Sequence, residues 1–188
     1  AARVWKIPEY EAQKVLDGLA DKAILLDIEQ DGQSTYVLPP PMAGFFEFSM
    51  MRLRDDVDQK ILAELFYQYL NVEDAFIREL FGAGDTKLGR VFVNEPALAP
   101  ELSLVIMDYE RASGVIQDAR HIGIGVCYCR HKMAHLGKAC QAPLDICMTF
   151  NNTADSLIRH GVIRRVDARE ALDLLAQAQE VNLVQFGD

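Results

Sequence analysis

Apolar residues recur every three or four positions in several stretches of this chain, which is the spacing of amphipathic helices. The clearest example runs from Ile61 to Leu70, directly after a charged stretch. Asp167 and Glu170 form a capping-box pattern that predicts the start of another helix, and Asp108 is a suitable N-cap for a third. The predicted helices cover residues 8–23, 61–70, 72–81, 109–119, 153–160 and 168–180.

Strand patterns alternate with these helices. Residues 24–29 and 34–38 flank Asp31 and Gly32, and this arrangement is a strong signal for a β-hairpin. A helix followed by a hairpin makes up the last half of a winged-helix unit, so we expect a partial winged helix at the N-terminal side. Further strands are predicted over residues 89–93, 121–126, 162–166 and 183–186. The predicted fold class is therefore α+β.

Two prolines, Pro96 and Pro100, mark the best candidate for a domain boundary. We expect residues 1–100 to form a winged-helix-like and helical region, and residues 101–188 to form a mixed α/β domain that carries a four-cysteine loop. The stretch 45–51 is dense in aromatic and methionine side chains. It either packs on the following helix of the same chain or contacts a partner subunit in a homo-oligomer.

The composition is that of a folded globular protein. The chain has 188 residues, of which half are hydrophobic and a quarter charged, and its formal net charge is −9. This acidity disfavours a nucleic-acid partner, because phosphate binding needs concentrated positive charge. No apolar run has the length of a membrane span. The first residues lack the apolar core of a signal peptide, and the absence of an initiator Met suggests a fragment or a processed chain.

All four cysteines of the chain lie close together, at Cys127, Cys129, Cys140 and Cys147. Disulfide-stabilised secreted domains spread their cysteines along the chain, so this clustering indicates a set of ligands in a reducing, cytoplasmic compartment. Thiolates are soft ligands that suit zinc or an iron–sulfur cluster. Four inert buried cysteines, or two disulfides, are the less favoured interpretations.

The spacing of these cysteines favours an iron–sulfur cluster over zinc. Structural zinc sites usually present pairs of ligands in regular knuckles, whereas here one pair encloses a single residue and the other encloses six. Arg130 and Lys138 are expected near the sulfurs, where they would donate hydrogen bonds to an anionic cluster. An exposed basic loop explains them equally well. His131 and His135, four residues apart, are an alternative pair of zinc ligands.

Residues 127–132 read CYCRHK and residues 136–147 read LGKACQAPLDIC. This pattern, Cys-x-Cys-Arg followed by Gly-x-x-Cys-x-x-Pro-x-x-x-Cys, resembles a family of 4Fe–4S-binding, ferredoxin-type proteins with an N-terminal winged-helix segment. The resemblance implies an iron–sulfur protein of electron transfer. Family members usually continue into a second cysteine-rich, ferredoxin-like segment, and this chain ends where that segment would begin. The cluster ligands that the resemblance implies are Cys127, Cys129, Cys140 and Cys147.

Three functions are compatible with the sequence. The first is an electron-transfer component that holds a 4Fe–4S cluster and meets a redox partner protein. The second is a zinc-stabilised structural or protein-interaction module. The third is a redox- or metal-responsive winged-helix regulator, which the acidic charge disfavours. An enzyme is not expected, because Gly123 and Gly125 lack the third glycine of a phosphate-binding loop and clustered thiols fit ligation better than a nucleophile pair.

Overall fold

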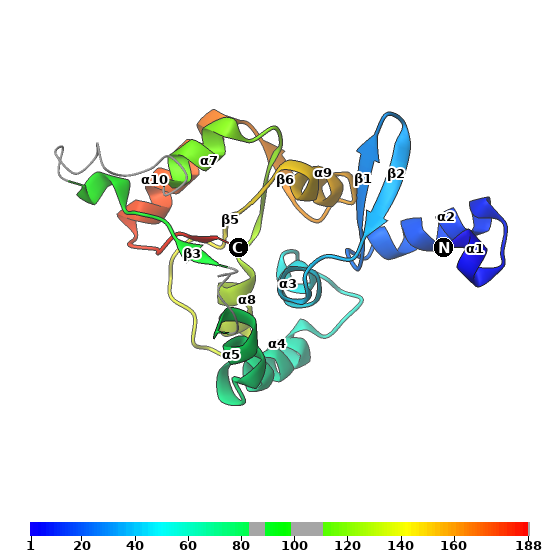
Figure 1. Ribbon diagram of the computed structural model, residues 1–188. Coiled ribbons are helices and arrows are strands. Elements are labelled where there is room, and N and C mark those ends of the chain that lie inside the picture. Colours follow the sequence, from blue (N-terminus) through cyan, green and yellow to red (C-terminus); the bar gives the residue numbers. More distant parts are fainter. Residues whose placement is uncertain (83–88, 99–110, 188) are drawn as a thin grey trace.

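The computed structural model describes residues 1–82, 89–98 and 111–187, and it mixes helices with short strands (Figure 1). The predicted α+β class is confirmed. The described helices are α1 (Ala2–Trp5), α2 (Glu9–Ala20), α3 (Phe48–Met50), α4 (Gln59–Tyr67), α5 (Ala75–Gly82), α7 (Ala112–Asp118), α8 (Tyr128–His135), α9 (Asn151–Arg159) and α10 (Ala168–Glu180). Shorter π- and 3-10-helical segments are η1 (Met42–Glu47), η2 (Gln68–Val72) and η3 (Glu95–Ala97).

The strands form three small antiparallel groups. A hairpin joins β1 (Leu26–Gln30) to β2 (Gln33–Val37), and β3 (Arg90–Val91) pairs with β7 (Phe186–Gly187). The third group has the order β5-β4-β6, with β4 (Ile122–Val126) between β5 (Asp145–Phe150) and β6 (Arg164–Val166). The prediction of a C-terminal half centred on the strand before the first cysteine is confirmed.

The predicted hairpin is present, and its turn follows from two residues. Asp31 and Gly32 have φ angles of 51° and 74°, the left-handed values that two-residue hairpin turns require. Asp108, the predicted N-cap of the helix before β4, lies outside the described residues; the described part of that helix is α7. No helix in the described residues is long and apolar enough to cross a membrane.

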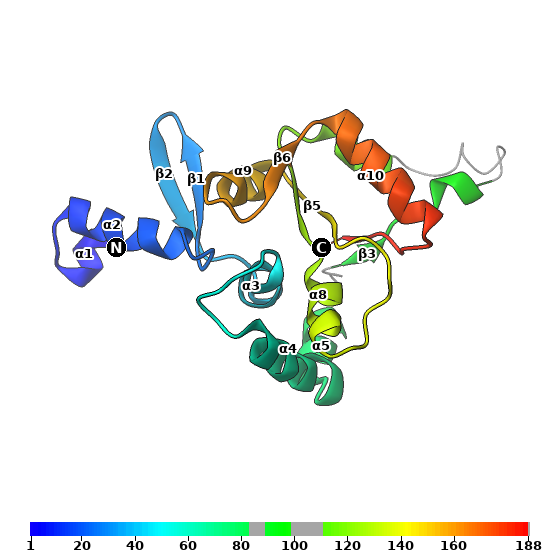
Figure 2. The ribbon, with the colours of Figure 1, turned by 180° about the vertical axis from the view of Figure 1, so that it is seen from behind.

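One hydrophobic core joins the two halves of the chain. Leu26 and Met51 from the N-terminal half pack with Leu157, Val162 and Ile163 from the C-terminal half. Figures 1 and 2 show the corresponding arrangement, with α9 between the β1–β2 hairpin and the three-stranded sheet. The boundary that we predict near residue 100 stays a prediction, because the adjoining residues 99–110 lie outside those described.

The aromatic and methionine stretch packs mainly inside its own chain. Phe46, Phe48, Met50 and Met51 are all buried, and Phe46 contacts Phe66 at a ring-centroid distance of 4.8 Å. The neighbouring Phe45 and, on α4, Ile61 and Leu65 remain exposed. The intramolecular alternative therefore accounts for most of this stretch, and a homo-oligomer stays a prediction.

A buried ion pair fixes the hairpin to α9. Asp27 on β1 accepts hydrogen bonds from Ser156 Oγ (2.6 Å) and from Arg159, whose Nη2 also donates to the Asp27 carbonyl (2.5 Å). His160 Nε2 lies 3.0 Å from the same carboxylate. Burial disfavours the charged carboxylate, but the hydrogen bonds from Arg159, Ser156 and His160 outweigh burial and hold the pKa of Asp27 below its ordinary value.

The Asp27→Asn substitution should lower the free energy of unfolding by about 2–4 kcal/mol, because it removes the buried carboxylate that pairs with Arg159 and leaves that charge only the more exposed Asp155 and Glu29. Urea unfolding followed by circular dichroism measures this. Asp56→Asn is the matched control, since the Arg54–Asp56 pair involves an exposed carboxylate, and it should change stability little. Equal effects of the two substitutions would contradict the structural role of Asp27.

The same pair predicts a dependence on pH. A carboxylate whose pKa is lowered by folding contributes stability above its unfolded pKa of about 3.9 and loses that contribution as the pH falls through the folded value. The difference in unfolding free energy between the native protein and Asp27→Asn should therefore shrink below about pH 4. A difference that stays constant from pH 7 to pH 3 would show that folding does not lower the pKa of Asp27, and a difference that grows on acidification would show that Asp27 is protonated in the folded protein.

Candidate metal centre

The first two cysteines lie at the junction between β4 and α8. Cys127 directly follows β4 and is the N-cap residue of α8, and Cys129 is in the first turn of that helix. Their sulfur atoms are 3.2 Å apart. Two backbone hydrogen bonds fix the junction, from Val126 N to Met51 O (2.9 Å) and from Cys127 N to Leu144 O (2.8 Å). The spacing of one residue thus brings both thiols to one end of the helix.

The other two cysteines follow α8 in the chain. Cys140 lies in the exposed loop after the helix, as predicted. Cys147, which we predict to belong to the same four-cysteine loop, lies instead on β5, where it pairs in register with Gly125 of β4. The strand follows from the alternation of apolar Ile146, Met148 and Phe150, a period-two signal that the sequence contains. None of the four cysteines is in a disulfide.

The first two thiols shift each other's ionisation in opposite directions. The hydrogen bond from Cys129, together with the Arg130 guanidinium, lowers the pKa of Cys127 to about 5. The same bond, burial and the charges of Cys127 and Cys147 raise the pKa of Cys129. A thiolate beside a thiol is the expected state of two such close groups, since both cannot ionise easily at this distance. The junction therefore already presents a thiolate, the form that binds metals.

Arg130 is the cation at the centre of these groups. Its Nε donates to Cys127 Sγ at 3.4 Å. A backbone hydrogen bond from Ala142 lowers the pKa of Cys140, and the Arg130 guanidinium adds to that effect. Its two terminal nitrogens, Nη1 and Nη2, are buried without an oxygen or nitrogen acceptor, and besides Cys127 the guanidinium interacts with the Cys140 thiol, whose sulfur is a weak acceptor. Buried guanidinium donors without acceptors are costly, so this place suits an anionic group that supplies acceptors.

The side chains of the other two lysines of the segment contact α4 and η2: Lys138, although exposed, contacts Tyr67 of α4, and the buried Lys132 contacts Asn71 of η2. Lys138 Nζ is 3.2 Å from the Tyr67 hydroxyl and 4.3 Å from the centre of the Tyr67 ring. Lys132 is buried and donates to Asn71 Oδ1 at 2.7 Å. Burial lowers the pKa of Lys132, and the nearby charge of Cys129 opposes that shift. Of the two residues predicted beside the sulfurs, Arg130 contacts one directly, and the role of Lys138 stays a prediction.

No three His, Cys, Asp or Glu side chains in residues 1–82, 89–98 and 111–187 are arranged to hold a metal ion. Two sulfurs are in contact, and the remaining two act on their neighbours through charge and through Arg130. The convergence of all four sulfurs on one volume stays a prediction.

His131 and His135 lie on one face of α8, as their spacing predicts. His131 is buried, and its Nδ1 is 2.8 Å from the carbonyl oxygen of Met50. The Nε2 atoms of the two imidazoles are 3.2 Å apart. Burial, together with the neighbouring His131, lowers the pKa of His135. The described contacts of both rings are with each other and with Met50, and the alternative that they bind zinc in place of two cysteines stays a prediction.

The Met50 carbonyl is the functional group that sequence reasoning missed. It comes from α3, far from α8 in the chain, and it fixes the ring of His131. No local pattern could reveal this contact, because it depends on how α3 packs against α8. The burial of Lys132 was also missed, because it depends on how α8 packs against Asn71 of η2.

No family model, curated protein or solved structure matches this chain. The function is therefore argued from the chemistry of the site.

The charge around Cys127 predicts how the metal-free protein reacts with iodoacetamide, which attacks thiolates. The midpoint of Cys127 alkylation against pH should lie near 5, well below the value of about 8.5 for an ordinary thiol. Arg130→Gln should move this midpoint upward, because it removes the positive charge. Peptide mass spectrometry of protein alkylated from pH 4 to pH 9 measures both.

Lys138→Gln is the control for that experiment, since the Lys138 ammonium contacts Tyr67. It should leave the Cys127 midpoint unchanged. A native midpoint near 8.5 would contradict the arrangement of Cys127, Cys129 and Arg130 described above.

Proposed function

We propose that this chain is an iron–sulfur protein of electron transfer, with a 4Fe–4S cluster held by Cys127, Cys129, Cys140 and Cys147. The observation that carries the proposal is Arg130, whose guanidinium interacts with the thiols of both Cys127 and Cys140 while its two terminal nitrogens are buried without an oxygen or nitrogen acceptor. A cluster with four thiolate ligands is anionic and supplies sulfur acceptors for such donors. When bound, the cluster supplies one-electron chemistry.

The residues of the chain have distinct parts in this proposal. The four cysteines provide soft thiolate ligands, and the hydrogen bond from Cys129 together with the Arg130 guanidinium lowers the pKa of Cys127, which favours its thiolate. Arg130 donates hydrogen bonds toward sulfur, which raises the reduction potential by stabilising the added negative charge. Tyr128 is the residue between Cys127 and Cys129. Its side chain packs against two hydrophobic clusters and so does not occupy the space beside the sulfurs.

Zinc is the alternative occupant, and the local geometry favours it less. A structural zinc site needs four ligands in a closed tetrahedron. Cys127 and Cys129 are separated by one residue at a strand–helix junction, and Cys147 extends from a strand rather than from a second knuckle. The irregular spacing of the ligands, which come from three different elements, suits a cluster better than two zinc knuckles. The 3.2 Å between the sulfurs of Cys127 and Cys129 is shorter than the roughly 3.8 Å between two thiolates on one zinc ion and shorter still than their separation on a cluster, so these two side chains would have to separate when either group binds.

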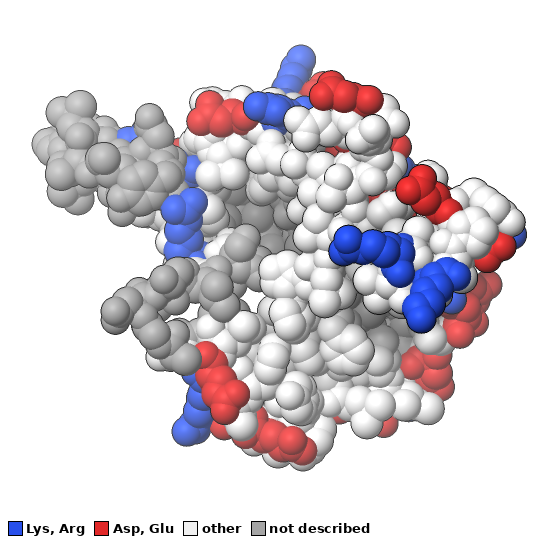
Figure 3. Space-filling view, turned by 45° about the vertical axis from the view of Figure 1, so that its right-hand side comes forward, with Lys and Arg blue, Asp and Glu red and all other residues white. Residues whose placement is uncertain are grey.

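The N-terminal elements belong to the same proposal. We propose that α2 and the β1–β2 hairpin are the winged-helix part of a 4Fe–4S-binding, ferredoxin-type protein, and that this part contacts a partner protein. Acidic Glu9, Glu11 and Asp17 lie exposed on α2, which disfavours duplex DNA. The face in Figure 3 carries acidic and basic side chains in separate small groups around an uncharged area. The proposed compartment is the cytoplasm, where clustered thiols stay reduced.

Metal analysis and EPR on protein purified without oxygen test the cluster. Iron and acid-labile sulfide should be present in equal amounts, and reduction should produce an EPR signal of a paramagnetic cluster. Replacing any one of the four cysteines with serine should lower the iron content severalfold, because a hard hydroxyl replaces a soft thiolate. It should also lower the thermal stability of the C-terminal half, since metal binding contributes to folding.

Gln141→Ser, next to Cys140 in the same exposed loop, is the control and should keep the native iron content. A colourless protein with zinc bound to the four cysteines would replace the cluster by a structural zinc site. Serine variants with native metal content would exclude both kinds of site.

A further inference from the structure

The imidazoles of His131 and His135 have no part in the proposed cluster, although they are arranged like metal ligands. They lie one turn apart on α8, with their Nε2 atoms 3.2 Å apart and their ring centroids 4.9 Å apart. Two neutral imidazoles gain only one weak hydrogen bond from this contact. A metal cation between the two Nε2 atoms could bind both of them at once, which is a stronger interaction than one hydrogen bond between neutral rings.

The Met50 carbonyl sets the protonation of the pair. A carbonyl oxygen can only accept, so the Nδ1 of His131 carries the hydrogen at the 2.8 Å contact. The Nε2 of His131 therefore presents a lone pair toward His135. A histidine ligand whose other nitrogen donates to a backbone carbonyl is the usual arrangement in metal sites, because the carbonyl fixes the ring and makes the ligand more basic.

The spacing of the nitrogens fits a tetrahedral ion. With metal–nitrogen bonds of about 2.05 Å, two nitrogens 3.2 Å apart subtend an angle of about 103° at the metal, close to the tetrahedral value. Such an ion would replace the shared hydrogen bond. His135 would then carry its proton on Nδ1 rather than on Nε2, with no net loss of protons.

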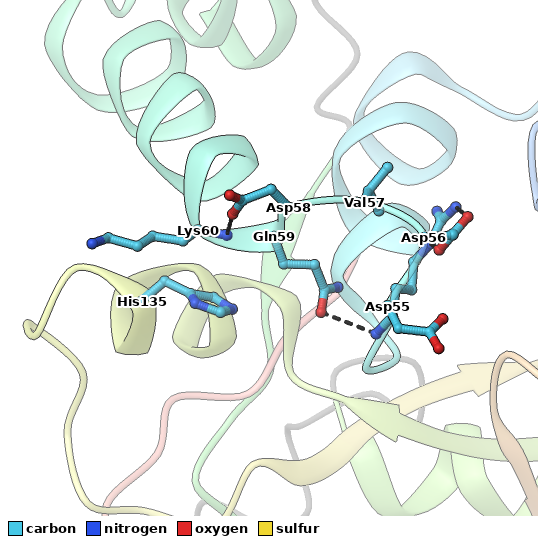
Figure 4. Close-up of a pocket in the computed structure, with 8 residues that line it drawn as sticks. Asp55, Asp56, Val57, Asp58, Gln59, Lys60 and His135 are labelled. Carbon is cyan, nitrogen blue, oxygen red and sulfur yellow. Dashed lines mark hydrogen bonds and ion pairs between the residues drawn. The ribbon is translucent and has the colours of Figure 1, made fainter.

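A cavity provides access to this pair. His135 is partly exposed and lines a cavity of about 500 Å³ together with the loop before α4. Figure 4 shows its imidazole directed toward the start of α4, where Asp58 and Lys60 also lie. The Asp58 charge acts on His135 in the direction that favours a cation there, and Lys60 acts in the opposite direction. Water can reach the remaining coordination positions from this cavity.

We propose that His131 and His135 form a second metal site, a two-imidazole chelate for a divalent transition metal such as Ni²⁺ or Zn²⁺, separate from the four cysteines. Imidazole nitrogen suits these ions, and the Met50 carbonyl and the buried position of His131 hold one ligand in place before binding. The site is open, because water completes the coordination. It does not depend on which group the cysteines bind.

Ni²⁺ titrated into the protein as purified without oxygen tests this site. Ni²⁺ is paramagnetic, so it should broaden the imidazole signals of His131 and His135 in long-range ¹H–¹⁵N NMR spectra. The other two of the four histidines, His121 and His160, should stay sharp. Calorimetry should show one Ni²⁺ bound per chain, and His135→Gln should weaken this binding at least about tenfold, as expected on losing one of two ligands.

Two variants separate this site from the cysteines. His121→Gln should leave the affinity for Ni²⁺ within twofold of the native value. Cys129→Ser removes no imidazole, so it should keep one Ni²⁺ site per chain and lose less affinity than His135→Gln, since only the stabilisation of α8 by the group on the cysteines is lost. His135 is chosen because it is partly exposed, whereas replacement of the buried His131 would also break its bond to Met50. Native affinity in His135→Gln, or loss of binding in Cys129→Ser, would overturn the proposal.

Discussion

The carbonyl groups of Met50 and Met51 fix the position of the candidate centre. The last carbonyls of a helix have no partner within it, and α3 ends at Met50. The Met51 oxygen accepts from Val126 N, the last residue of β4, and the Met50 oxygen accepts from His131 on α8. These two bonds lie on either side of Cys127, so α3 holds both the strand that leads to the first cysteine and the helix that follows it.

Two glycines on β4 allow this strand to lie close to Met51 and Ile163. A Cβ atom at Gly125 would lie 2.7 Å from Ile163 Cγ2 and 3.0 Å from Met51 Cε, and one at Gly123 would lie 2.3 Å from Ile163 Cδ1. The strand therefore presents bare backbone to Ile163 and, at Gly125, to the Met51 side chain. In the sequence, Gly123 and Gly125 suggest at most an incomplete phosphate-binding loop. In the fold they allow β4 to lie directly under the core residues that connect the two halves of the chain.

Local patterns determined which parts of the fold could be predicted. The helix over residues 168–180 was predicted with its observed bounds, because Asp167 Oδ1 accepts from Glu170 N at 2.8 Å as a capping box requires. The hairpin at Asp31 and Gly32 was predicted for the same reason, because its signal lies in two adjacent residues. In contrast, α8 and β5 were not predicted, because the cysteine segment suggested a loop around a metal. Burial of charged Lys132 against Asn71 depends on tertiary packing, and so no local pattern revealed it.

The four cysteines could be identified from the sequence because clustered thiols rarely have a role other than ligation, whereas no sequence pattern indicates the contact between Met50 and His131.

The contact with Met50 also bears on the stability of α8. Cys127, Cys129, His131 and His135 all belong to α8 or to its N-cap, a helix of 8 residues that is too short to be stable alone. Its stability comes from packing on α3 and α4 and from the bond to Met50. A metal bound to either set of ligands would favour the helical state of α8, and by linkage each would then strengthen the binding of the other. The thiolates and the imidazoles can therefore be chemically independent and still be coupled through the folding of the helix that carries them.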